Sequence, residues 1–359
     1  YMVARFHFLY SGIEEIGLFI AYIGAFSALL AAFIATRQTD IKKILAYSTM
    51  SQLGYMFIAV GLGFYSTGLF HVFTHAFFKA MLFMGAGGVI MAIHHEQNIF
   101  KIAQHRASLP IIGATFLVGV IAISGIPPFS GFFSKDAILA AAFQEGQYLI
   151  WAIAMFTAFL TAFYMFRMYF IVFVAPNHHD EHYVYTSKTI TIPLLILAIG
   201  AIGAGFLNLP TVFGGNHFVD TWLGQLNSKH IHMDIVTEYV LMALSIIVAA
   251  TGIMAAYSKY ANFDVTKPED ETGLIGNKFY VDEIYNVLFV QSTKKVSTFI
   301  DKVVDEKIID AFIMNSAIGF VNIGKRVAMI QNANVRFYAA FMLVGMTAVF
   351  IYLYITLGL

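Results

Sequence analysis

The sequence predicts an all-α fold: a polytopic membrane helix bundle of about eight transmembrane spans, one of them broken, plus a long amphipathic lateral helix. Three observations support this prediction. Of the 359 residues, 59% are hydrophobic and 12% are charged, about half the charged fraction of a typical soluble protein. Apolar runs of membrane length recur along the chain. Two adjacent prolines, Pro127 and Pro128, interrupt one of these runs.

The charge and cysteine content exclude several classes of function. Lysine and arginine total 21, and aspartate and glutamate also total 21, so there is no basic surplus for binding nucleic acid. The absence of cysteine excludes disulfides, cysteine-ligated iron–sulfur clusters, zinc–thiolate sites and thiol catalysis. The sequence contains no recognisable nucleotide-binding motif or nucleophile triad, so we expect no redox site in this chain.

The distribution of charge divides the chain into three regions. Residues 1–258 carry 22 of the 42 charged side chains and are predicted to form the membrane helix bundle. Residues 259–336 carry the other 20 and are predicted to form a linker and an amphipathic lateral helix. Residues 337–359 are predicted to be a C-terminal transmembrane anchor helix. Because the chain starts at Tyr1 without a methionine, we expect it to be part of a longer protein.

Eight segments are apolar enough to span a bilayer, which takes about 20 residues. They are Ile16–Thr36, Ile44–Gly63, Gly68–Ile93, Ile111–Phe143, Tyr148–Ala175, Ile190–Leu207, Ile235–Tyr257 and Phe337–Leu357. The fourth segment is too long for one simple crossing and contains the Pro127-Pro128 pair. We therefore expect two half-helices joined by a short non-helical stretch, which is tolerated only inside protein or beside a wet cavity.

Lysine and arginine gather in alternate connections, which predicts the orientation of the spans. One set of connections holds Arg37, Lys42, Lys43, Lys101, Arg106, Lys188, Lys259 and Lys267. The other set holds only Arg5 and Lys229. The first set is therefore expected to face the cytoplasm.

Residues 279–333 show the periodicity of an amphipathic helix. Val296, Phe299, Val303, Ile308 and Phe312 recur at helical spacing, and charged residues fall largely between them. A helix of about 50 residues would be roughly 75 Å long. Two interpretations are open: a helix lying on the lipid surface, or a strut over neighbouring subunits. The nearly balanced charge favours the strut.

Three titratable residues, His71, His75 and Lys79, interrupt the apolar third span. Their spacing of four places them on one helical face. Titratable groups inside a span are costly and are functional candidates by default. Imidazole titrates near neutral pH, so the stripe is predicted to be a proton path. The alternative is three separate polar groups that bond to neighbouring helices.

Lys135 and Asp136 follow the Pro127-Pro128 break by seven and eight residues. Lys135 is expected near mid-membrane, beside backbone groups that the break leaves free, where it could load and release a proton. Adjacent residues point about 100° apart on a helix, so a tight pair between the two is not expected. The alternatives are a snorkelling Lys135 and a static ion pair.

Two further features are weaker. His178 and His182 are one turn apart and could ligate a metal, but they lie in an exposed loop, and no metal site is predicted there. Arg167 lies near a span end and is expected to face an interior path.

Several motifs resemble the antiporter-like subunits of respiratory complex I. Two of them are Asp40-Ile-Lys-Lys-Ile-Leu-Ala-Tyr-Ser-Thr-Met-Ser-Gln-Leu-Gly-Tyr55 and Thr74-His-Ala-Phe-Phe-Lys-Ala80. Gly125-Ile-Pro-Pro-Phe-Ser-Gly-Phe-Phe-Ser-Lys-Asp136 resembles the subunit L family, called subunit 5 in mitochondria, and 94–101, 278–285 and 303–310 strengthen that resemblance. The likeness covers nearly the whole chain. It implies that residues 1–258 contain the second antiporter-like repeat and that the first repeat precedes Tyr1.

The resemblance implies a proton-translocating membrane subunit of NADH–quinone oxidoreductase, driven by electron transfer in other subunits. No cofactor is expected in this chain; NADH, flavin, iron–sulfur clusters and quinone are expected in other subunits. His71, His75 and Lys79 would belong to a central polar axis, Lys135 would link that axis to one side of the membrane, and Asp136 would help the exit step.

The implied partners are the other membrane-arm subunits of complex I, especially the neighbouring antiporter-like subunits, together with the lipid bilayer. The implied location is the bacterial inner (cell) membrane, crossed several times. Two alternatives stay open: the large subunit of a multisubunit sodium/proton antiporter, and a non-pumping membrane scaffold.

Overall fold

The computed structural model describes residues 1–359 except 11, 105–106, 177–181, 184–186, 216–217, 227, 268, 270, 332 and 359. The regular structure of its described part is helical apart from two short strands, β1 (Ala107–Ser108) and β2 (His182–Tyr183), which pair in parallel. The chain divides into two compact units, Tyr1–Phe279 and Tyr280–Leu359. The three-part division expected from the charge distribution stays a prediction.

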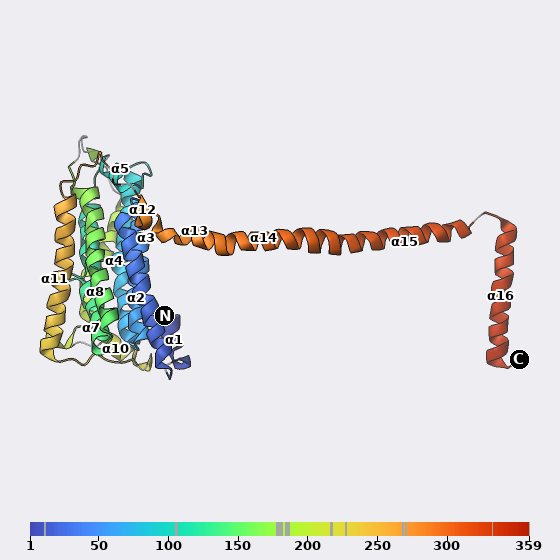
Figure 1. The fold of residues 1–359 in the computed structure, drawn as a ribbon, viewed down its shortest axis with the longest axis horizontal. Coiled ribbons are helices and arrows are strands. Elements are labelled where there is room, and N and C mark those ends of the chain that lie inside the picture. Colours follow the sequence, from blue (N-terminus) through green and yellow to red (C-terminus); the bar gives the residue numbers. More distant parts are fainter. Residues whose placement is uncertain are drawn as a thin grey trace. The chain divides into compact units, whose positions relative to one another are not determined.

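The first unit is a bundle of long helices (Figure 1). They are α2 (Glu14–Arg37), α3 (Ile41–Gly61), α4 (Tyr65–Ala92), α6 (Pro110–Ser124), α7 (Ser130–Gln144), α8 (Tyr148–Tyr169), α9 (Lys188–Gly203) and α11 (Ile235–Tyr260). Shorter helices occupy the connections: α1 (Met2–Arg5), α5 (Ile99–Gln104), α10 (Phe218–Trp222) and α12 (Gly273–Gly276). A π-helical turn at Phe170–Val174 extends α8, and 3-10 turns lie at His7–Leu9, Ala204–Leu207, Thr211–Phe213, Gly224–Leu226 and Lys278–Tyr280.

Eight helices in the described chain are long and apolar enough to cross a membrane. Seven of them coincide with predicted spans, and the eighth is the Lys278–Ile330 segment, which the sequence analysis assigns to the lateral helix. The remaining predicted span, Ile111–Phe143, is the pair of shorter helices α6 and α7. The prediction of an all-α membrane bundle with one broken span is therefore confirmed.

The break between α6 and α7 follows from the local sequence. Gly125 ends α6 in the left-handed conformation (φ +77°), which a glycine adopts without steric cost. Pro127 and Pro128 then lack the amide hydrogens that would continue the helix. Gly131 opens α7 so close to α6 that a Cβ there would lie 1.9 Å from the carbonyl oxygen of Ala122. The two half-helices can approach this closely only because residue 131 has no side chain.

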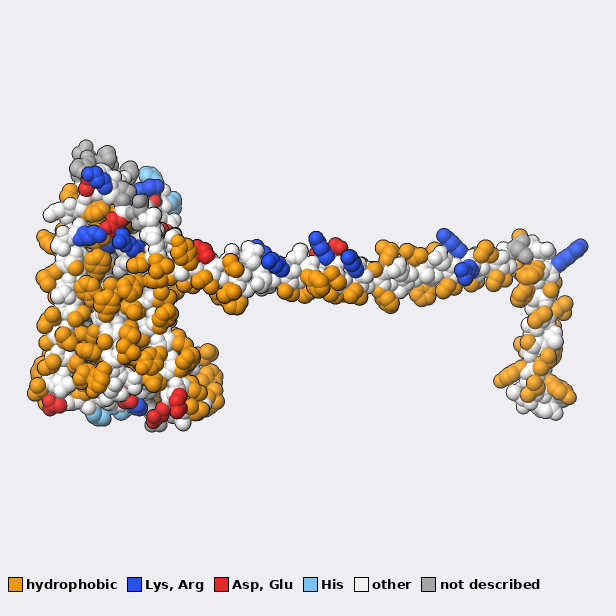
Figure 2. Space-filling model, in the orientation of Figure 1, with side chains coloured by type: hydrophobic (Ala, Val, Ile, Leu, Met, Phe, Trp, Pro, Cys, Tyr) orange, Lys and Arg blue, Asp and Glu red, His pale blue; other side chains and the backbone are white. Residues whose placement is uncertain are grey.

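The connections meet at two ends of the bundle. One end, which we call the basic end, holds the connection that carries Arg37, Lys42 and Lys43. There Thr39 donates its backbone N–H to Glu271 (2.7 Å), and Ile41 donates to the carbonyl of Gln97 (3.0 Å). At the other, the Lys229 end, the Lys229 ammonium lies 2.6 Å from the Glu145 carboxylate. Figure 2 shows charged side chains at these two ends of the bundle and a hydrophobic band between them. This distribution is the one that a bilayer requires.

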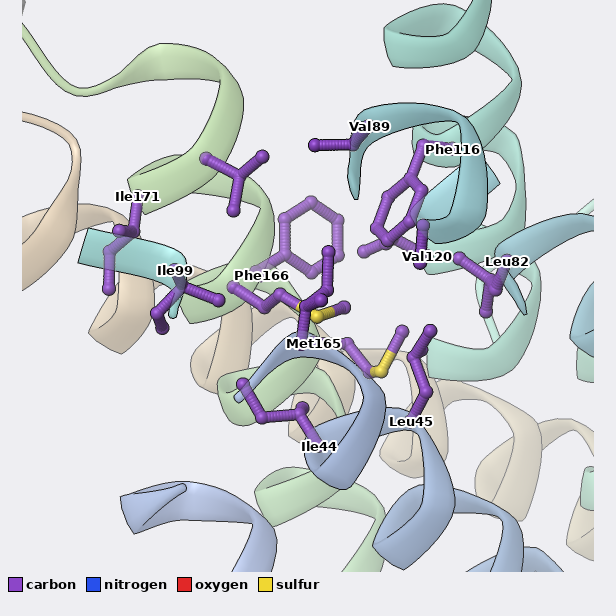
Figure 3. Close-up of a cluster of buried hydrophobic side chains, with 14 of the residues drawn as sticks. Ile44, Leu45, Leu82, Val89, Ile99, Phe116, Val120, Met165, Phe166 and Ile171 are labelled. Carbon is purple, nitrogen blue, oxygen red and sulfur yellow. The ribbon is translucent and has the colours of Figure 1, made fainter. Parts of the chain in front are cut away.

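The largest apolar cluster packs α3, α4, α6 and α8 together (Figure 3). Ile44 and Leu45 of α3 face Leu82 of α4 and Met165 of α8, and all four side chains are fully buried. Along α3 and α4 these residues lie nearer to the basic end than Lys79 does. The cluster therefore separates the polar interior from the basic end.

The second unit contains one long helical run and a final helix. The run comprises α13 (Val281–Tyr285), a π-helical stretch (Asn286–Gln291), α14 (Ser292–Phe299), a second π-helical stretch (Ile300–Asp310) and α15 (Ala311–Ile330). The last helix, α16, is Val335–Leu357 and is capped by the side chain of Asn334. No described side chain of these helices is buried. Along the run, charged side chains gather mostly on one side and apolar ones on the other (Figure 2).

Candidate functional site

The three titratable residues of α4 lie on one face of that helix, as their spacing requires. His71 and Lys79 are buried, and His75 is partly buried. The imidazole ring centroids of His71 and His75 are 6.3 Å apart. The Nε2 atom of His75 is buried and has no hydrogen-bond partner among the described residues. The structure therefore brings the two histidines together but leaves one imidazole nitrogen unsatisfied.

His71 joins α4 to two other helices. Its Nε2 lies 3.1 Å from Oε1 of Gln52 on α3, and its Nδ1 lies 2.9 Å from the hydroxyl of Ser134 on α7. Thr74 also reaches the Ser134 hydroxyl, at 2.7 Å. Because an amide oxygen only accepts, Nε2 carries the proton of the neutral ring, and Nδ1 is left to accept a proton from the Ser134 side. Ser134 precedes Lys135, so the contact connects the stripe to the broken helix.

Lys79 lies at the end of the stripe nearer to the basic end. Its ammonium donates a hydrogen bond to the Ser48 hydroxyl on α3. It also lies 5.6 Å from the ring centroid of Phe83, one turn along α4. Lys79 therefore has one polar partner and one aromatic face in an otherwise apolar setting.

Lys135 is buried (3% exposed) in the second turn of α7. Its side chain runs past Gly125, where a Cβ would lie 3.6 Å from the Lys135 Cδ. Its Nζ lies 5.3 Å from the ring centroid of Tyr55 and has no hydrogen-bond partner among the described residues. Charging an unpaired lysine in such a place costs several kcal/mol, so its charge depends on small changes around it.

Asp136 points to different neighbours from those of Lys135. Its Oδ1 accepts a hydrogen bond from the Ser245 hydroxyl on α11 (2.8 Å). Asp136 and Ser245 line a small cavity beside Lys135. Asp136 also lines a cleft of about 450 Å³ at the Lys229 end, together with His230, His232 and Glu238. The carboxylate therefore lies between the Lys135 cavity and the cleft.

Three of the five predicted site residues, His71, Lys79 and Asp136, bond to side chains that could not be singled out from the sequence, whereas His75 Nε2 and Lys135 Nζ have no partner among the described residues. The partners are Ser48, Gln52, Ser134 and Ser245, and Thr74 also bonds to Ser134. Their only sequence signal is that hydroxyl and amide groups occur within apolar spans, where each needs a hydrogen-bond partner. Ser and Thr satisfy that need so often within their own helix that the signal is weak.

Arg167 faces the interior, as expected, but its partners are structural. The guanidinium, which is fully buried, donates to the carbonyl of Gln38 (2.9 Å) and lies 3.4 Å from the Glu269 carboxylate. Lys259 contacts the same carboxylate at 2.6 Å. Burial raises the pKa of Glu269, but its contacts with Lys259 and Arg167 outweigh this and hold the pKa below its usual value. These contacts hold α8, α11 and the connection after Arg37 together at the basic end.

The possible metal motif at 178–182 lies outside the described side chains. Among the residues that the structure does describe, no group of three or more histidine or acidic side chains is arranged to hold a metal ion.

The membrane-length helices and the buried titratable residues of α4 and α7 define a polytopic membrane protein with ionisable side chains in its interior. Residues 1–161 match a family model described as "NADH:quinone oxidoreductase/Mrp antiporter, TM". All five predicted site residues lie within this match.

Relatives cover nearly the whole chain. The chain is 37% identical to NAD(P)H-quinone oxidoreductase chain 5 of Picosynechococcus sp., over 94% of the chain and 56% of that protein. It is 35% identical to NADH-quinone oxidoreductase subunit L of Campylobacter jejuni (93% and 54%) and 33% identical to subunit L of Neisseria meningitidis (96% and 57%). The chain thus spans a little over half the length of these relatives. It is a relative of the subunit L and chain 5 proteins, as its motifs predict, and a multi-pass protein of the bacterial inner-membrane type.

Proposed function

We propose that this chain carries protons across the membrane as part of an antiporter-like subunit of an NADH–quinone oxidoreductase. The observation that carries the proposal is the setting of Lys135. This lysine is buried and unpaired at the broken helix. On one side it adjoins the Ser134–His71 contact, and on the other it shares a small cavity with Asp136, which in turn borders the cleft. A lysine placed between two polar routes can take a proton from one and give it to the other.

The contacts suggest an order for the transfer. Lys79, His75 and His71 follow one another along α4, and His71 is bonded to Ser134 next to Lys135. Asp136 then borders the cleft at the Lys229 end. If the basic end faces the cytoplasm, as the distribution of lysine and arginine predicts, this cleft opens outward. Protons would then leave through it.

The relatives' names support membership of a larger complex. They are called NADH-quinone or NAD(P)H-quinone oxidoreductase subunits and chains. The proposed partners are therefore other membrane subunits of such a complex, above all neighbouring antiporter-like subunits. NADH, flavin, iron–sulfur clusters and quinone would be held by other subunits, whose electron transfer would drive the protons.

The long helix of the second unit is proposed to clamp neighbouring subunits together. Val281–Ile330 presents apolar side chains along one side, and none of its described side chains is buried by this chain. Partner subunits could cover that side. Deletion of residues 296–330, with α16 retained, should reduce recovery of the assembled complex. A deletion variant that assembles and pumps fully would refute the clamp.

The central test is Lys135→Met in the complete subunit and its complex, reconstituted into vesicles. Methionine preserves the length of the side chain and removes a buried charge, so the fold should be kept. Proton pumping driven by NADH oxidation should be lost, whereas Lys188→Met at the surface should pump normally. Full pumping by Lys135→Met, at equal assembly, would refute the proposed function.

A second candidate is the large subunit of a sodium/proton antiporter, because the matching family description also names Mrp antiporters. The two functions differ in their driving force. A redox-driven pump acidifies vesicles only while NADH is oxidised, whereas an antiporter moves protons in response to a sodium gradient alone. Sodium-driven proton flux without NADH would favour the second candidate.

A further inference from the structure

The side of α3 that faces the site carries more polar groups than the proposed path uses. Ser48, Ser51, Gln52 and Tyr55 are spaced three, four and seven residues apart, which places them on one helical face. All four are fully buried. Ser48 and Gln52 already bond to Lys79 and His71, so this face runs beside the α4 stripe. Ser51 has no part in the path described above.

Three atoms on or beside this face are buried without a hydrogen-bond partner among the described residues. They are the Ser51 hydroxyl, the Gln52 side-chain nitrogen and the hydroxyl of Tyr164 on α8. Tyr164 is fully buried, and its hydroxyl faces those of Ser48, Ser51 and Thr161. Buried polar groups in native proteins are almost always paired, often through ordered water. Several such groups facing one another therefore indicate a place that binds water.

The two ends of this polar face reach the two lysines. At one end Ser48 accepts the hydrogen bond of Lys79. At the other end the Tyr55 ring lies 5.3 Å from the Lys135 ammonium. The Tyr55 hydroxyl donates to the carbonyl of Ala154 (2.5 Å). Seven residues of helix separate Ser48 from Tyr55, or roughly 10 Å, which a few hydrogen bonds can span.

We propose that the hydroxyls of Ser51 and Tyr164 relay protons in a second, hydroxyl-lined branch between Lys79 and Lys135. It runs parallel to the imidazole branch through His75 and His71. Each hydroxyl accepts one proton and donates its own, so a proton moves along the chain of hydroxyls and bound water while every oxygen stays neutral. The inference rests on the proposed proton-carrying role of the two lysines.

Two parallel branches make a specific prediction for paired variants. Tyr164→Phe should reduce the rate of NADH-driven pumping several-fold without stopping it, because the imidazole branch still conducts. His75→Leu should also leave part of the rate. The double variant should fall to the level of Lys135→Met, a greater loss than the product of the two single losses. Tyr169→Phe, a half-buried tyrosine on the same helix, should pump normally.

The measurement is the initial rate of vesicle acidification by the complete complex, in H₂O and in D₂O, at matched assembly. A changed solvent isotope effect in Tyr164→Phe supports a role in proton transfer, because a packing role would not alter it. Ser51→Ala, a smaller change, should give the same pattern and decides the question if Tyr164→Phe fails to assemble.

Two results would be decisive against different claims. If Tyr164→Phe and Ser51→Ala pump like Tyr169→Phe, and the double variant equals His75→Leu alone, the second branch is overturned. If Lys135→Met itself still pumps, the proposed function fails, whatever the Tyr164 variants do.

Discussion

The bundle contains two buried lysines in different surroundings. Lys79 lies in the unbroken helix α4 and donates to Ser48. Lys135 lies just after the break between α6 and α7, without a hydrogen-bond partner among the described residues and beside a small cavity. A cleft at the Lys229 end adjoins its neighbour Asp136.

The difference indicates two roles for the same side chain. A lysine with a fixed hydroxyl partner keeps one geometry and suits a relay position. A lysine without such a partner, beside a break in the backbone, gains or loses its charge when nearby groups shift, because one unit of pKa corresponds to only about 1.4 kcal/mol. We therefore propose a relay role for Lys79 and a switching role for Lys135, and the following variants test that division.

The largest effect is expected from disrupting the close contact between α6 and α7 at the break. Gly131→Ala places a methyl group 1.9 Å from the Ala122 carbonyl oxygen, so α6 and α7 must move apart. Such overpacking should destabilise the bundle by at least about 2 kcal/mol and displace Lys135. Thermal unfolding and pumping should both be impaired. Gly87→Ala on α4 is the control, because nothing lies within 4 Å of a Cβ there. Equal behaviour of the two variants would contradict this account of the break.

Loss of the relay lysine should stop most transport while leaving the fold intact. Lys79→Ala removes the group from which both branches start, so pumping should fall by at least about tenfold, since a positioned proton carrier typically contributes more than that. Lys188→Ala, at the start of α9, is the control and should pump normally. Equal vesicle acidification by both, at equal assembly, would remove Lys79 from the path.

Ser48→Ala should have the smallest effect of the three. It removes the hydroxyl partner of Lys79 and thereby makes that lysine resemble Lys135. A typical hydrogen bond contributes a net stabilisation of about 1 kcal/mol, so we expect pumping to fall roughly fivefold, with an altered pH profile. Ser258→Ala, whose exposed hydroxyl bonds only within α11, should change neither. An unchanged pH profile in Ser48→Ala would show that the hydroxyl does not set the behaviour of Lys79.

Much of this fold could be predicted from local sequence. Apolar runs predict the spans, and Pro127-Pro128 with Gly125 predicts the break, because these residues act on their own backbone. The α4 stripe follows from a spacing of four. The partners of the site could not be predicted, because Gln52 meets His71 only through the packing of α3 on α4. The cleft likewise depends on distant connections that meet at one end.

Arg167 illustrates the same limit. Its position near a span end indicates an interior location, which the structure has. Its role depends on Glu269, which is 102 residues away in the chain. No local pattern shows that this acidic residue returns to pair with the arginine.

The most direct test of the central claim is proton pumping by the complete complex carrying Lys135→Arg, compared with Lys135→Met and with the unchanged protein. A guanidinium stays protonated at any physiological pH, so arginine can hold the charge but cannot release a proton. If Lys135 switches by loading and unloading a proton, the arginine variant should assemble and yet fail to acidify vesicles, as the methionine variant does. Undiminished pumping by Lys135→Arg would show that only a static charge is needed there, and the switching role would be abandoned.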